Sequence, residues 1–151
     1  MQYQSRKFSC GPATLANVLN LLEVEGGRVT EDAACVHTTE GTNERQLKAG
    51  IEKHGCYAEV HKGRDSLGAI QWLDVCVNLG TPVILCVDAW SHWVAVVGKL
   101  GSDYLVIDPA DPELLTKLNS GKVSARWNHK KRYYGIAVVK PVKLTETYLC
   151  S

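Results

Sequence analysis

Cys10 stands directly before the pair Gly11-Pro12, and Gln4 lies six residues upstream of it. Proline suits the first turn of a helix, where its missing N–H is not needed. A helix N-terminus stabilises an anion, and the thiolate is the nucleophilic form of cysteine. Gly11 leaves room for a substrate backbone, and the amide of Gln4 can donate to an oxyanion. Cys10 is therefore a candidate nucleophile; the alternative is a cysteine that only packs before a helix.

A cysteine nucleophile needs a base, and the base needs a third group to orient it. His92 is the best placed of the five histidines, because it opens a strand-like run after a turn-like segment, residues 88–91. Asp108 ends another strand-like run, directly before Pro109. The other histidines lie in polar segments with no evident orienting partner: His37, His54, His61 and His129.

The register of one expected hairpin decides whether His92 can meet Asp108. If the turn at residues 99–103 pairs Gly98 with Tyr104, the paired residue numbers sum to 202 and Val94 faces Asp108. His92 then lies on the same face as Asp108 and diagonal to it, at about 7–8 Å, which these side chains can bridge. An odd sum would send the two to opposite faces. Asp108 can also be interpreted as a turn-forming residue before proline.

The elements that must position these residues change character along the chain. Helical spacing of apolar residues in 12–22 predicts a helix that Gly26-Gly27 ends, Asn43 and Gln46 are typical of a cap for a helix over 43–54, and Ser66 is expected to cap a third helix through Leu79. Four apolar runs predict strands, at residues 82–88, 92–98, 104–108 and 133–139. Helices in the first half and an antiparallel sheet in the second indicate an α+β fold.

Residues 119–134 are polar and basic, and they predict a loop or a surface edge. Their five cations are expected to form a solvated face: Lys122, Arg126, Lys130, Lys131 and Arg132. Trp90 and Trp93 flank His92 and are candidates for the wall of a cleft, although we expect at least one of them to pack in the core.

Composition narrows the class of protein. The chain has 151 residues, which we expect to form a single domain, with 17 Lys and Arg against 16 Asp and Glu, a balance that argues against nucleic-acid binding. No apolar run approaches the length of a membrane span, and the N-terminus lacks the apolar core of a signal peptide, so we expect a cytoplasmic protein. The six cysteines match no zinc or CxxC pattern, and Cys76 and Cys86 lie in apolar runs.

Several motifs in this order resemble the bacteriocin-processing cysteine peptidases, papain-like enzymes that cut after double-glycine leaders. The resemblance lies in Gln4 with residues 9–15 around Cys10, in residues 91–98 around His92, and in residues 106–109 around Asp108. The connecting residues 40–42 and 80–84 are also similar. The match extends from Gln4 to about Asp108, and it departs from the family at Ser9, where members often have aspartate, a difference that bears on substrate preference.

This resemblance implies a papain-like fold, in which a helical half carrying the nucleophile packs on an antiparallel sheet carrying histidine and aspartate. It implies that Cys10 is the nucleophile, His92 the general base and acid, and Asp108 the group that orients His92. Gln4 and the Cys10 N–H would form the oxyanion hole. No cofactor or metal is implied, and the partner would be a peptide or protein substrate. No transporter segment is visible, so we expect a stand-alone bacterial or phage domain.

Three interpretations remain open at the level of sequence. The first is a cysteine peptidase or related amidase that works through a thioester acyl-enzyme. The second is a papain-like enzyme of another reaction type, such as a deamidase, a transamidase or a cell-wall endopeptidase. The third is a binding module that kept the fold and lost turnover; the presence of all four catalytic residue types argues against it.

Overall fold

The computed structural model describes residues 2–5, 8–35 and 41–141, which form an antiparallel six-stranded sheet with helices on both faces. The strand order is β1-β6-β2-β3-β4-β5. The helices are α1 (Cys10–Leu21), a 3₁₀ turn η1 (Val24–Gly27), α2 (Glu31–Ala34), α3 (Glu44–Lys53), α4 (Ser66–Asn78) and α5 (Ser120–Trp127). The strands are β1 (Tyr57–Gly63), β2 (Val83–Val87), β3 (His92–Leu100), β4 (Asp103–Ile107), β5 (Leu115–Leu118) and β6 (Tyr133–Val139). The predicted α+β class is confirmed.

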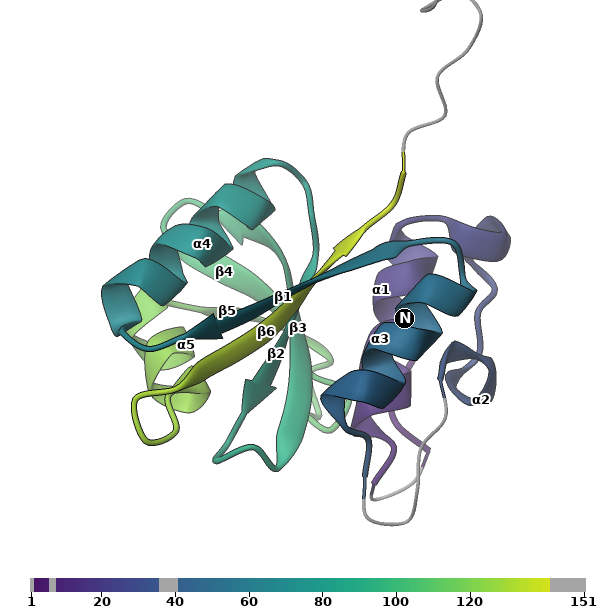
Figure 1. Cartoon of the computed structure of the whole chain (residues 1–151), viewed down its shortest axis with the longest axis horizontal. Helices are drawn as coiled ribbons and strands as arrows, with labels where there is room; N and C mark the ends of the chain where they lie inside the picture. The colour runs from purple at the N-terminus through teal and green to yellow at the C-terminus, as the bar shows by residue number, and fades with distance from the viewer. Residues whose placement is uncertain (1, 6–7, 36–40, 142–151) are drawn as a thin grey trace, which may run out of the picture.

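The sheet separates two apolar layers, as Figure 1 shows with α1 to α3 on one side and α4 and α5 on the other. Strand β2 is buried along its whole length, and its side chains alternate between the layers because successive residues of a strand face opposite ways. Ile84 and Cys86 pack with the α1 and α3 residues, while Leu85 packs with α4 and α5. A continuous apolar run such as residues 83–87 is what burial on both faces requires.

Helix α1 begins at Cys10 itself and is buried over its first ten residues. A Cβ on Gly11 would lie 2.7 Å from the Thr42 Cβ, so only glycine lets the segment before α3 approach the first turn of α1. This close contact with Thr42 is a different reason for the glycine from the predicted one, room for a substrate. The predicted helix from Pro12 is confirmed and starts two residues earlier.

The cap of α3 agrees with the sequence prediction, whereas the cap of α4 differs. Asn43 accepts from the Gln46 N–H and the Gln46 side chain accepts from the Asn43 N–H, which completes the expected capping box. Asp65 caps α4 by accepting from the Gly68 N–H at 2.7 Å. Ser66, the predicted cap, is instead the first residue of that helix, because the side chain that accepts from the first-turn N–H of Gly68 belongs to Asp65.

The prediction of a loop or a surface edge over residues 119–134 is wrong for α5, residues 120–127, and for the start of β6 at Tyr133. Residues 120–127 form α5, capped by Asn119, whose side chain accepts from the Lys122 N–H. Val123 and Trp127, four residues apart, bury the inner face of α5 and hold it against the sheet. The sequence does not predict the strands β1 and β5, because neither contains a fully buried residue and neither forms an apolar run.

The hairpin of β3 and β4 reaches the predicted alignment by a different route. Next to the turn, Gly98 pairs with Leu105 and Lys99 with Tyr104, so the predicted pairing of Gly98 with Tyr104 is wrong. A bulge between Val96 and Gly98 then inserts one residue into β3, and Val96 pairs with Val106. Beyond the bulge the register sum is the predicted one, which brings the start of β3 and the end of β4 to the same face.

Among the described residues, none of the helices is long and apolar enough to cross a membrane.

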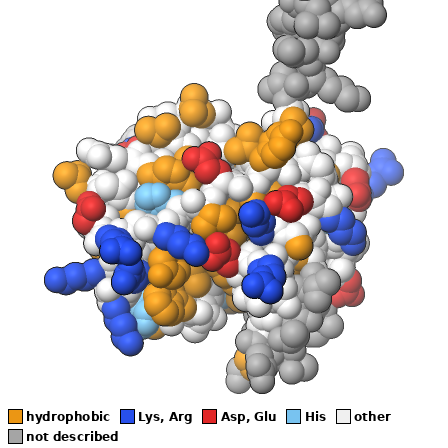
Figure 2. All heavy atoms as spheres, in the orientation of Figure 1, with side chains coloured by type: hydrophobic (Ala, Val, Ile, Leu, Met, Phe, Trp, Pro, Cys, Tyr) orange, Lys and Arg blue, Asp and Glu red, His pale blue; other side chains and the backbone are white. Residues whose placement is uncertain are grey.

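On the face of the molecule in Figure 2, acidic and basic side chains are interspersed over the middle, and Lys and Arg side chains gather on the side of α5. Exposed Lys122, Lys130 and Lys131 belong to the α5 segment and the turn that follows it. Residue 40 of the similar connecting segment, His37 and Cys150 lie outside the described residues.

Candidate active site

Three elements meet at one end of the sheet and bring the candidate residues together. Cys10 is the first residue of α1, His92 is the first residue of β3, and Asp108 directly follows the last residue of β4. The antiparallel pairing of β3 with β4 puts the start of one strand beside the end of the other. The N-terminus of α1 reaches this end of the sheet from the layer that contains α1 to α3. The site therefore lies between the two apolar layers.

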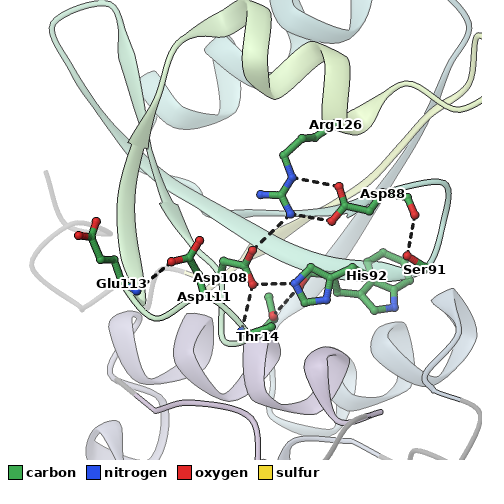
Figure 3. A network of polar contacts seen from close by, with 10 residues as sticks. Thr14, Asp88, Ser91, His92, Asp108, Asp111, Glu113 and Arg126 are labelled. Atoms are coloured by element: carbon green, nitrogen blue, oxygen red, sulfur yellow. Dashed lines mark hydrogen bonds and ion pairs between the residues drawn. The ribbon is translucent and has the colours of Figure 1, made fainter.

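His92 and Asp108 are joined by a short hydrogen bond. The His92 Nε2–H donates to Asp108 Oδ1 at 2.6 Å, and both side chains are largely buried (Figure 3). The same Asp108 oxygen accepts from the Ala110 N–H at 3.0 Å, which fixes the carboxylate after the strand ends. This bond occupies Nε2 of the imidazole, so Nδ1 is the nitrogen that a thiolate of Cys10 could approach.

Burial and hydrogen bonding act in opposite directions on the Cys10 thiol. Burial alone would raise the pKa of Cys10, but the hydrogen bond from His92, the backbone N–H groups of Trp93 and Gly11, and the His92 charge lower the pKa below its ordinary value. Burial alone would likewise lower the pKa of His92, while the hydrogen bonds to Asp108 and Cys10 and their negative charges raise the pKa to about 9. Both shifts favour a thiolate beside an imidazolium.

A buried threonine connects the nucleophile helix to the histidine strand. Thr14 lies one turn after Cys10 on α1, and its hydroxyl donates to the Trp93 carbonyl at 3.0 Å. The Trp93 indole N–H in turn donates to the Thr42 carbonyl at 2.8 Å. Thr42 is the residue that presses on Gly11, so these contacts close a ring around the start of α1 and set its distance from His92.

The segment that carries Gln4 is held from two sides. Gln2 exchanges two hydrogen bonds with the buried Asn17 side chain on α1, at 2.7 and 2.9 Å. The Gln4 N–H donates to the Pro109 carbonyl at 3.2 Å, next to Asp108. The half-buried Gln4 is therefore fixed between the nucleophile helix and the loop that follows β4. The four candidate residues thus come from four segments that converge on one end of the sheet.

A pocket of about 280 Å³ is lined in part by Thr42, the residue that a Cβ on Gly11 would meet. Its lining includes Thr42, Cys86, Trp90, Trp93 and Tyr134. Trp90 and Tyr134 stack with their ring centroids 5.3 Å apart. Trp93 belongs to the core as well as to the pocket wall, and Trp90 is 44% exposed, so the expected division of the two tryptophans between core and cleft wall is present.

Arg126 is the site neighbour that sequence reasoning missed. Its Nη2 lies 3.3 Å from Asp108 Oδ2 and its guanidinium also binds Asp88, whereas the sequence predicted a solvated cation in a loop. The signal that could have found it is the Asn119 cap followed by Val123 and Trp127, which identifies a helix and places Arg126 beside its buried face. In the part of the chain that the structure describes, no cluster of three or more His, Cys, Asp or Glu could hold a metal ion.

The fold is that of the papain-like peptidase domains which process double-glycine leaders. The peptidase domain of Streptococcus ComA, a bifunctional ABC transporter of a quorum-sensing pathway, is 18% identical, with a TM-score of 0.69 over 93% of this chain and 97% of that one. A double-glycine motif protease from an AMS/PCAT transporter, solved with its leader peptide, is 22% identical, with a TM-score of 0.62 over 93% and 89%.

A putative C39-like peptidase from Bacillus anthracis has the same fold, with 16% identity and a TM-score of 0.66 over 95% of both chains. No family model matches this sequence, and no curated protein matches it either. The predicted papain-like fold is confirmed, while the roles of the individual residues rest on their geometry.

Proposed function

We propose that the protein is a cysteine peptidase that hydrolyses a peptide or amide bond through a thioester acyl-enzyme, with Cys10 as nucleophile. The observation that carries the proposal is the short His92–Asp108 hydrogen bond together with a buried Cys10 thiol whose pKa His92 lowers against the effect of burial. A cysteine that only filled space would have its pKa raised by burial, as Cys35 does. The arrangement therefore supports nucleophilic catalysis and not packing alone.

The reaction begins with the proton already on His92. The Cys10 thiolate attacks the carbonyl carbon of the scissile bond, and the negative charge moves to the carbonyl oxygen. The side-chain N–H of Gln4 and the backbone N–H of Cys10 stabilise this oxyanion in our proposal. His92 then gives its proton to the leaving amine, and the carbon–nitrogen bond breaks to leave a thioester.

Hydrolysis of the thioester reverses the roles. His92, now neutral, takes a proton from water, and the hydroxide attacks the thioester carbonyl. The acid product leaves, and Cys10 departs as the thiolate beside a protonated His92, so the enzyme is restored. Asp108 stays ionised throughout, because it holds the imidazole in one tautomer and stabilises its positive charge without accepting the proton.

The substrate in this proposal is a peptide that enters beside the aromatic pocket. A pocket of about 280 Å³ with walls from Trp90, Trp93 and Tyr134 suits an apolar side chain next to the scissile bond. The structurally similar double-glycine motif protease was solved with a leader peptide, which makes Gly-Gly leaders the first substrates to try.

A peptidyl electrophile tests the proposal without knowledge of the natural substrate. We expect a peptide vinyl sulfone to label wild-type protein at Cys10 and to leave Cys10→Ala unlabelled. Peptides from a library that includes Gly-Gly leaders should be cleaved by wild type and not by Cys10→Ala. Equal labelling of Cys10→Ala, or cleavage that survives that substitution, would remove Cys10 from the reaction.

A further inference from the structure

Asp108 uses its two carboxylate oxygens in different ways. Oδ1 binds His92 and the Ala110 N–H, while Oδ2 faces Nη2 of Arg126 at 3.3 Å. Figure 3 shows Asp108 linked to both His92 and Arg126, and Asp88 bound to the same guanidinium. A contact on the second oxygen limits rotation of the carboxylate, and the angle of that carboxylate sets the direction of its bond to His92.

Arg126 is itself held by a two-pronged contact with Asp88. Its Nε donates to Asp88 Oδ1 at 3.0 Å and its Nη2 donates to Asp88 Oδ2 at 2.7 Å, a fork geometry that lysine cannot reproduce. The Asp88 N–H also donates to the Arg126 carbonyl at 2.9 Å. Both ends of the arginine are therefore tied to one residue of the turn between β2 and β3.

That turn, residues 88–91, leads directly into His92 at the start of β3. Asp88, Ala89 and Trp90 all have positive φ, at 53°, 57° and 65°, a backbone region that L-residues adopt at a cost. Ser91 stabilises the turn by donating its hydroxyl and its N–H to the Asp88 carbonyl. A turn made of three such residues needs outside contacts to keep one shape, and the Arg126 fork supplies two of them.

Arg126 can act on the turn because its helix is anchored. The neighbouring Trp127 is fully buried, and its indole N–H donates to the Tyr134 carbonyl at 2.8 Å. The guanidinium thus connects a helix fixed in the core to the turn before His92 and to the aspartate after β4. These contacts come from the opposite layer to the one that carries Cys10.

We infer that Arg126 is a positioning residue for the candidate triad, which holds Asp108 and the turn before His92 in the geometry that keeps the His92–Asp108 bond short. This inference rests on the proposed function for its consequence in catalysis, but the bond itself can be measured without substrate. A merely electrostatic role has the opposite sign: removing a cation near Asp108 would leave the carboxylate more negative and strengthen its bond to His92.

The test compares the ring N–H signal of His92 in proton and ¹⁵N spectra of wild type, Arg126→Met and Lys122→Met. Lys122 is an exposed cation on the same helix, so its substitution is a matched control for charge and helix. We expect the His92 Nε2–H signal of Arg126→Met to move upfield or to exchange faster with water, and that of Lys122→Met to stay in place. A signal that is unchanged or moves downfield in Arg126→Met would overturn the inference.

A second variant and a second readout keep the test decisive. Asp88→Asn removes the charged partner of Arg126, and asparagine tolerates a positive φ, so this variant should fold even if Arg126→Met does not. It should move the His92 Nε2–H signal in the same direction as Arg126→Met. Iodoacetamide should modify Cys10 in Arg126→Met roughly 10-fold more slowly than in wild type, the fall in thiolate fraction that follows when its pKa rises by about one unit above the pH. A wild-type Cys10 no faster than the other cysteines would contradict the proposed function, while the His92 signal would still judge Arg126.

Discussion

Cys10 at the start of helix α1 and Cys35 directly after helix α2 are buried in the same apolar layer, but their pKa values shift in opposite directions. Cys10 is 7% exposed and Cys35 is 6% exposed. Burial raises the pKa of Cys35 to about 12, with no counteracting partner among its causes. At Cys10 the same burial is outweighed, and the pKa is lowered.

The comparison separates burial from chemistry. Depth in the core does not distinguish the two thiols, but the neighbours do: Cys10 meets a protonated imidazole, the Gly11 N–H at the N-terminus of α1 and the Trp93 N–H on β3. Cys86, buried in β2 near Cys10, also has its pKa raised to about 12, first by burial and then by the charges of Cys10 and Glu44. A reactive cysteine in this fold is therefore defined by His92 and by its place on α1.

The largest effect should follow from removal of the Cys10 sulfur. Cys10→Ala should reduce cleavage of a peptide substrate by roughly a million-fold, the scale of losing a nucleophile from a catalytic triad. Substrate turnover by purified wild type and variant gives the ratio. Turnover within tenfold of wild type would mean that another residue is the nucleophile.

His92→Ala should remove most of the difference in pKa between the thiols of Cys10 and Cys35. Without the imidazole, burial again dominates at Cys10, its pKa rises, and turnover should fall by roughly 10²- to 10⁴-fold for loss of the acid–base group. The variant should remain folded, as circular dichroism can verify, because His92 lies at the rim of the sheet. Unchanged turnover would exclude His92 from the mechanism.

Substitution of Asp108 should have a graded effect. Asp108→Ala should lower kcat by less than His92→Ala does, because the imidazole stays in place and loses only the partner that orients it. Asp108→Asn should retain more activity, since an amide oxygen can still accept from Nε2–H. If Asp108→Ala turns over substrate as fast as wild type, Asp88 and Asp111 become the carboxylates to substitute next.

The pKa of His92 should set the upper pH limit of turnover. Activity should rise as Cys10 loses its proton, at a pH below the usual range of a thiol. Activity should fall as the pH passes about 9, where His92 loses the proton that the leaving amine needs. Above that pH kcat/KM should drop by about tenfold per pH unit. A profile still rising at pH 10 would contradict the imidazolium assignment.

The smallest effect on activity should come from Cys35→Ala. It should lower the free energy of unfolding by about 1–2 kcal/mol, as small core truncations do. Turnover and the rate of Cys10 modification should match wild type, because Cys35 is not among the groups that shift the pKa of Cys10 or of His92. Thermal unfolding and kinetic assays of the same preparation separate the two effects.

The sequence predicted most of what positions the site, because strong local signals specify those elements. The Asn43 and Gln46 capping box and the apolar run of β2 are such signals. The meeting of His92 with Asp108 was predicted on a register that is wrong near the turn, and it holds because the bulge after Val96 shifts the pairing by one residue. A single inserted residue of this kind leaves no clear pattern in an apolar strand.

Arg126 could not be found from charge pattern alone. It stands among basic residues, and its partners Asp88 and Asp108 are 38 and 18 residues away in sequence. Only the packing of α5 on the sheet, through Val123 and Trp127, brings it to the site. Tertiary contacts of this length follow from the fold and not from local propensity.

Competitive alkylation tests the central claim most directly. Wild-type protein is treated with limiting iodoacetamide near neutral pH, and the rate of modification at each cysteine is mapped by mass spectrometry. We expect Cys10 to react faster than every other cysteine, and Cys35 to remain unmodified until the protein unfolds, since the thiolate is the reactive form. Equal and slow modification of Cys10 and Cys35 would contradict the claim that His92 and the α1 N-terminus make Cys10 a nucleophile.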